Sequence, residues 1–95
     1  MPAYLVARVH VTDAEKYEDY KKLSPAAIAA YGGRFLARGG VVETLEGKKE
    51  DRRVVIVEFP DLAAARAFYD SPPYRAARAA RAGAAEAQFI IVEGI

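Results

Sequence analysis

The sequence predicts an α+β domain with the order strand–helix–strand–strand–helix–strand. Three observations lead to this prediction. Residues 3–11 alternate apolar and polar side chains and are rich in β-branched residues. Residues 53–59 carry the run VVIV, which indicates a strand buried on both faces. Each of these strands is followed by a capped helix with a Ser-Pro break, so the two halves of the chain mirror each other.

The first half begins with the strand at residues 3–11. Thr12 and Glu15 form a capping box, which predicts that a helix begins here. Residues at spacings of three give this helix an apolar stripe made of Ala14, Tyr17, Tyr20 and Leu23. The pair Ser24-Pro25 predicts a break or bend before the helix ends at Gly32-Gly33.

The second strand is expected over residues 34–45. Glycines interrupt it at Gly39-Gly40, where we predict a β-bulge. A charged turn, EGKKEDR, occupies residues 46–52 and leads into the third strand.

The second half follows the same plan. Pro60 ends the third strand, and Asp61 caps a helix over residues 62–70. Ser71-Pro72-Pro73 breaks this helix, which continues over residues 74–82 until Gly83. The last strand is expected over residues 86–93.

This order of elements is that of the ferredoxin-like fold, a split βαβ repeat. Right-handed crossovers then predict an antiparallel sheet with strand order 4-1-3-2. Both helices would cover one face of the sheet. Because the other face also carries apolar side chains, we expect a homodimer in which a second copy covers it.

Composition limits the classes of function. The 95 residues are expected to form one domain, residues 1–95. The net charge of +1 and the absence of exposed aromatics on the third strand argue against nucleic acid as a partner. The chain has no cysteine, which excludes disulfides and thiolate metal sites. No segment has the pattern of a signal peptide or a membrane span, so a cytoplasmic location is expected.

Three stretches resemble a bacterial family of small proteins of unknown function. They are YGGRFLARGG at residues 31–40, EFPDLAAARAFYDSPPYRAARAAR at residues 58–81 and VEG at residues 92–94. The resemblance covers nearly the whole chain and implies a dimeric α/β barrel, in which two ferredoxin-like sheets face each other. Proteins with related folds include cofactor-free monooxygenases, lactone isomerases and haem-handling enzymes, so the fold alone does not identify a reaction.

Three residues are candidates for catalysis. His10, at the end of the first strand, is the single histidine and either acts as a base or is an exposed or hydrogen-bonded residue of the strand end. Arg38, beside the predicted bulge, either points inward to clamp an anion or lies at the surface. Glu58, in a strand expected to be buried, is either a base or the ion-pair partner of Arg8 or Arg38.

Four residues are candidates for binding a substrate. Ser71 and Tyr74 flank the Ser-Pro-Pro break, which would place them at the rim between helix and sheet. Ser71 is also a typical helix cap. Tyr31 ends the first helix, where aromatics more often belong to the core. Arg81 ends a basic stripe on the last helix and either faces solvent or turns inward to bind an anion.

The sequence therefore supports two functions. The first is an enzyme without metal, flavin or other cofactor that acts on a small organic acid or carbonyl compound, in the manner of a monooxygenase or isomerase. Here Arg38 would hold an anion and His10 or Glu58 would move a proton. The alternative is a non-catalytic, ligand-binding or stress-related dimer. A cavity lined by Arg38, Tyr74 and Glu58 would favour the enzyme, whereas a closed, alanine-packed core would favour the non-catalytic dimer.

Overall fold

The computed structural model describes all residues from 1 to 95 and confirms the predicted order of strands and helices. The elements are β1 (Ala3–Val11), α1 (Ala14–Ala30), β2 (Arg34–Arg38), β3 (Arg53–Phe59), α2 (Leu62–Asp70), α3 (Pro72–Ala80) and β4 (Ala85–Glu93). The antiparallel sheet has the order β2-β3-β1-β4, which is the predicted order 4-1-3-2 read from the opposite edge. None of the helices is long and apolar enough to cross a membrane.

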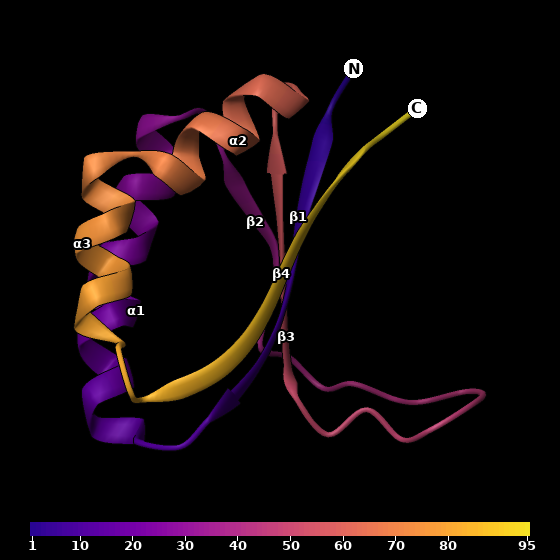
Figure 1. Cartoon of the computed structure of the whole chain (residues 1–95). Helices are drawn as coiled ribbons and strands as arrows, with labels where there is room; N and C mark the ends of the chain where they lie inside the picture. The colour runs from indigo at the N-terminus through magenta and orange to yellow at the C-terminus, as the bar shows by residue number, and fades with distance from the viewer.

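All three helices lie on the same side of the sheet, and the other face is left bare (Figure 1). We call these the covered face and the open face. The covered face packs Leu5, Ala7 and Val9 of β1 against aromatic rings of the helices. Phe68 and Tyr74, which stack at 4.3 Å between ring centroids, are central to this core and almost fully buried. Burying such rings is the main stabilising contribution in a domain of this size.

Helix α1 differs from the prediction at two points. Its N-cap is Asp13 and not Thr12, because the Asp13 side chain accepts the hydrogen bond from the Lys16 amide at 3.1 Å. Of the two alternatives predicted at Ser24-Pro25, a break or a bend, the break is wrong, since the helix runs through Pro25 without interruption. Buried residues on both sides of the proline, including Ser24 and Ile28, hold the two turns against the sheet.

Strand β2 is much shorter than predicted. It ends at Arg38, and the next residue, Gly39, has a φ of +72°, a conformation that favours glycine. Residues 40–52, which we call the arm, form a long loop that projects beyond the open face (Figure 1). Val41 and Leu45 of the arm are each 94% exposed, so the apolar pattern that suggested a strand has no partner within the subunit.

The β-bulge lies earlier than predicted. Phe35 pairs with Val57, but Ala37 pairs with Ile56, so Leu36 is the extra residue. In a regular register, Arg38 would point to the open face. The extra residue instead sets Arg38 opposite Val55, whose side chain belongs to the covered face.

The junction between α2 and α3 confirms the predicted helix break. Ser71 donates its hydroxyl to the Phe68 carbonyl at 2.6 Å and accepts from the Tyr74 amide at 3.3 Å. Helix α3 begins at Pro72 rather than at residue 74, because prolines are accommodated in the first turn of a helix. Strand β4 begins one residue earlier than predicted.

Candidate functional site

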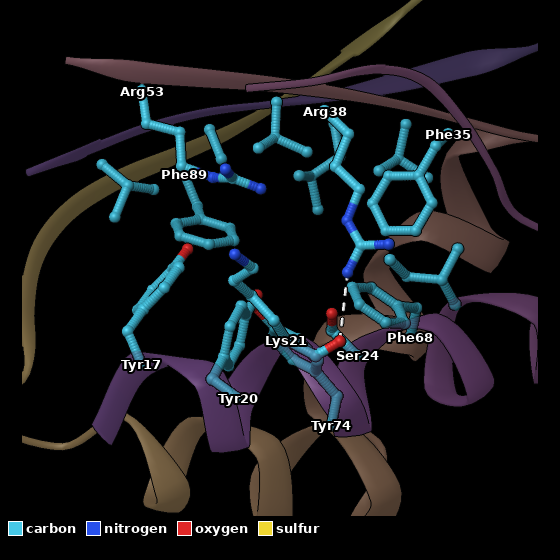
Figure 2. A pocket seen from close by; sticks show the side chains of 16 residues that line it. Tyr17, Tyr20, Lys21, Ser24, Phe35, Arg38, Arg53, Phe68, Tyr74 and Phe89 are labelled. Atoms are coloured by element: carbon cyan, nitrogen blue, oxygen red, sulfur yellow. Dashed lines mark hydrogen bonds between the residues drawn. The ribbon is translucent and has the colours of Figure 1, made fainter. Parts of the chain in front are cut away.

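A small cavity lies between the covered face of the sheet and the helices (Figure 2). Most of its lining is apolar or aromatic, and includes Leu5, Ile28, Phe35, Phe68 and Phe89. Its volume is about 30 Å³. Ligand sites for small molecules usually measure about 300–1,000 Å³, so the cavity as it stands is too small for an organic ligand. A ligand would enter only if lining side chains moved aside.

Three cationic side chains converge on this cavity. Lys21 comes from α1, Arg38 from β2 and Arg53 from β3, and Figure 2 shows all three extending toward the same space. No aspartate, glutamate or histidine lines the cavity. Glu18 pairs with the Lys21 ammonium at 2.9 Å at the protein surface, and this hydrogen bond lowers the pKa of Glu18. Like charges brought close together repel, and this repulsion favours binding of an anion between them.

Arg38 is held in place by two contacts. Its guanidinium donates to the Lys21 carbonyl at 3.0 Å and lies 4.5 Å from the centroid of the Phe35 ring. The Lys21 carbonyl is available because residue 25, which would normally donate to it, is a proline without an N–H group. The Leu36 bulge and Pro25 therefore act together to position Arg38 at the cavity.

Arg53 depends on Gly39 in a similar way. A side chain at Gly39 would collide with the Arg53 guanidinium, so glycine provides the space that this group occupies. The Nε atom of Arg53 is buried and has no hydrogen-bond partner. The Nε atoms of Arg78 and Arg81 are buried without a partner as well, but these two guanidinium groups lie over aromatic rings, whereas that of Arg53 lines the cavity.

The floor of the cavity carries two tyrosine hydroxyls in mutual contact. Tyr20 of α1 and Tyr74 of α3 are 2.7 Å apart between their hydroxyl oxygens. Burial raises the pKa of both phenols, because it penalises the charged form. Both groups are therefore neutral hydrogen-bond donors over the physiological pH range. Tyr17 and Ser24 also line the cavity.

Arg78 and Arg81 support the aromatic cluster from α3 and its C-cap. The Arg81 Cζ atom lies 5.2 Å from the Tyr20 ring centroid and 5.1 Å from that of Phe89, and Arg78 lies 4.3 Å from Tyr69. Arg81 turns inward, which was one of the two predicted alternatives, although it does not line the cavity itself. Arg78 and Arg81 of the basic stripe thus pack on aromatic rings rather than being fully solvated.

His10 and Glu58 lie on the open face, across the sheet from Arg38. His10 pairs in register with Glu86, and Glu58 forms an ion pair with Arg34 at 2.9 Å. The expectation that either residue shares a cavity with Arg38 within one subunit is wrong. The expected partners of Glu58, Arg8 and Arg38, are also wrong. For Arg38 the Leu36 bulge is the reason, because it moves this side chain to the opposite face from Glu58. Arg8 lies on the same face as Glu58 but pairs with Glu50 of the arm.

The predicted binding residues divide in the same way. Tyr74 lines the cavity, whereas Ser71 is buried as the cap of α3. Tyr31 is the C-cap of α1 and packs against the core.

Three cavity residues were not singled out from the sequence as candidates: Lys21, Arg53 and Tyr20. Arg53 had a usable signal, because strand alternation places it on the same face as Val55 and Val57. The sequence signal for Lys21 was weaker: it stands four residues before Pro25, so its backbone carbonyl lacks the usual helical donor. Tyr20 was assigned to the apolar stripe of the helix and not to a site.

The residues present offer no evident metal centre. No group of three or more histidine, cysteine, aspartate or glutamate side chains is arranged to hold a metal ion. What the cavity provides is cationic groups, hydroxyl donors and apolar walls.

Comparisons with solved structures support the fold. A protein of unknown function from Rhodopseudomonas palustris superposes with a TM-score of 0.76 at 25% identity, over 99% of this chain and 82% of that one. The cofactor-independent oxygenase SnoaB from Streptomyces nogalater superposes with a TM-score of 0.69 at 18% identity, over 99% of this chain and 93% of that one. A dimeric ferredoxin-like protein of unknown function from Jannaschia sp. CCS1 superposes with a TM-score of 0.72 at 14% identity, over 99% of this chain and 100% of that one.

No curated protein matches the chain. A family model does match, over residues 2–95, and confirms the resemblance to a family of unknown function. The chain belongs to the DUF1330 family, described as a domain of unknown function.

Proposed function

We propose that the cavity binds a small, partly apolar organic acid or carbonyl compound, and that the protein acts on it as an enzyme without a cofactor. The observation that carries this proposal is the convergence of Lys21, Arg38 and Arg53 on a cavity that no carboxylate lines. The apolar and aromatic walls fit the carbon skeleton of such a ligand, and the cations fit its negative charge.

The chemistry follows from the charges. Cationic groups close to an enolisable carbonyl compound or a phenol favour its deprotonated form and lower its pKa. Stabilising an enolate or phenolate is the central step in isomerising such a compound. The same anion is the electron-rich species that reacts with dioxygen in a cofactor-free oxygenation. The released proton goes to solvent at the mouth, because no carboxylate or histidine lines the cavity.

The similarity to SnoaB is compatible with this proposal. That protein is a cofactor-independent oxygenase, and it shares the fold of this chain over nearly its whole length. At 18% identity the likeness supports the fold, and the activity remains a proposal for this chain.

One observation favours the non-catalytic alternative. His10 and Glu58, the two groups best suited to move a proton, lie on the open face and not at the cavity. A protein that only binds an organic anion needs the cations and no base. Turnover of a bound CH-acidic compound would separate the two functions, since a binding protein leaves the compound unchanged.

We further propose that the open face forms a homodimer. Val6, Ile56, Ile90 and Val92 lie on this face, and Ile90 and Val92 are each 51% exposed. The arm carries the exposed Val41 and Leu45 beyond the same face (Figure 1), where they would contact a second copy. The structural neighbour from Jannaschia is dimeric. Mass measurement in solution tests this, and a monomer at micromolar concentration would contradict it.

The test of the ligand proposal is a thermal-shift screen with small aromatic carboxylates, phenols and 3-oxo acids. A ligand present at a hundred times its dissociation constant adds about 2.7 kcal/mol to the free energy of unfolding. We expect a shift with at least one carboxylate that is lost in Arg38→Ala.

The matched control is Arg34→Ala, which removes an arginine from the same strand on the open face. It should keep the shift. A shift that survives Arg38→Ala, or that Arg34→Ala removes equally, would rule out the cavity as the binding site.

A further inference from the structure

The hydroxyl pair at the cavity floor has one hydrogen-bond donor more than it uses. Tyr20 and Tyr74 each carry one hydroxyl proton, and their contact at 2.7 Å uses one of the two. The Arg81 guanidinium also interacts with the Tyr74 hydroxyl, but it can only donate and so uses no hydroxyl proton. One O–H group of the pair therefore makes no hydrogen bond to an acceptor of the chain.

The surroundings of the pair contain few acceptors. Tyr20 and Tyr74 both line the cavity, together with the donors of Lys21, Arg38 and Arg53 and the hydroxyls of Tyr17 and Ser24, neither of which hydrogen-bonds the pair. The one backbone carbonyl that is freed nearby, that of Lys21, already accepts from Arg38 at 3.0 Å. The pair is buried, Tyr74 completely so, and an unpaired buried hydroxyl costs free energy. A ligand oxygen that accepts this proton would remove that cost.

We propose that the Tyr20–Tyr74 pair is a subsite for the uncharged carbonyl oxygen of a keto acid whose carboxylate lies among Lys21, Arg38 and Arg53. The inference rests on the proposed function and narrows it from organic acids in general to compounds that carry both groups. Enolisation of such a ligand places negative charge on the oxygen held by the pair, where a neutral donor in a dry cavity stabilises it most.

The electrostatics of the pair agree with this role. Burial raises the pKa of both phenols, so the pair stays protonated and donates. The Arg81 guanidinium lies over the Tyr20 ring and partly offsets the effect at Tyr74. The pair therefore acts as a donor to the ligand and not as a base.

The experiment uses two series of probes that differ in one atom. The three acetylbenzoate isomers carry a carboxylate and a ketone at different separations, and each matching isopropenylbenzoate replaces the ketone oxygen by a CH₂ group. Dissociation constants are measured by calorimetry on the full-length protein. We expect at least one acetylbenzoate to bind about three- to tenfold more tightly than its isopropenyl partner, the range for one hydrogen bond.

The matched variant is Tyr20→Phe/Tyr74→Phe. Because both partners of the hydrogen bond are removed together, no unpaired hydroxyl is left and the fold should be retained. We expect the double variant to bind both series equally, while Tyr69→Phe, which changes a neighbouring ring outside the cavity lining, keeps the preference.

The outcomes separate the two proposals. No preference for any acetylbenzoate, or a preference that persists in the double variant, overturns the subsite even if the carboxylates still bind. Failure of both series to bind wild-type protein overturns the ligand proposal itself and the subsite with it.

Discussion

The two faces of the sheet differ in whether their arginines are paired with carboxylates. On the open face, the arginines are paired: Arg8 contacts Glu50 of the arm, and Arg34 contacts Glu58. On the covered face, Arg38 and Arg53 point into a cavity that no carboxylate lines. A structural role explains the paired arginines. Arg38 and Arg53 have no carboxylate partner, and the buried Nε atom of Arg53 has no hydrogen-bond partner. This difference is what supports the proposed site for an anion.

The faces also differ in the burial of their apolar residues. The substitution with the largest expected effect on stability tests the covered face. Phe68→Ala empties the core of the covered face and should lower the free energy of unfolding by about 3–5 kcal/mol. Denaturant unfolding measures the loss. A change below about 1 kcal/mol would mean that the covered face is not the main core.

The open face is tested by Ile90→Lys. Ile90 is 51% exposed in the single subunit, so the substitution should cost that subunit little. In a face-to-face dimer it would bury an unpaired charge, which costs several kcal/mol. We expect the mass in solution to fall from dimer to monomer while the circular dichroism spectrum of the subunit is retained. An unchanged dimer would place the interface elsewhere.

Pro25 tests the link between helix and cavity. Pro25→Ala restores the missing N–H donor in α1 and should stabilise the protein by about 2 kcal/mol, since proline inside a helix costs about 3 kcal/mol and part of this is offset in the unfolded state. The new donor competes with Arg38 for the Lys21 carbonyl. We therefore expect weaker binding of carboxylates by a more stable protein. Equal or tighter binding would show that the carbonyl does not position Arg38.

The buried tyrosines predict how stability changes at alkaline pH. Their pKa values are raised in the folded state, so the unfolded state releases its phenol protons first. The stabilising contribution is complete below the ordinary pKa of 10.0 and is lost as the pH rises above it. Tyr20→Phe/Tyr74→Phe should lose less stability than wild type between neutral and alkaline pH in denaturant titrations. Parallel losses would contradict the burial of the pair.

The smallest expected change in stability occurs at acid pH and involves the ion pair of Glu50 with Arg8 on the open face. The amide of Arg52 and the guanidinium of Arg8 hydrogen-bond Glu50 and lower its pKa below the ordinary 4.5. The contribution is present above that value and is lost as the pH falls through the lowered pKa. Because the pair is exposed, the change should be small and weaker in salt. Glu50→Gln should remove this pH dependence, and its persistence would assign it to another group.

The elements that follow strict local rules were predictable. Alternation identified β1, the VVIV run identified β3, and Asp61 and Ser71 were recognised as helix caps. The mirrored halves then gave the sheet order. The prediction failed where tertiary contacts overrode local signals. Packing against the sheet carries α1 through Pro25, and the valines and leucine of the arm were mistaken for strand residues because their exposure is not visible in the sequence.

The sequence by itself determined the fold class, the strand order and the family resemblance, because alternation, caps and breaks are local signals repeated in both halves. Only the tertiary structure decided which charged residues meet. A single extra residue, Leu36, reverses the face to which Arg38 points, and a register shift of one residue is not encoded in any local pattern. The site therefore depends on strand pairing, in which residues distant along the chain fix each other's orientation.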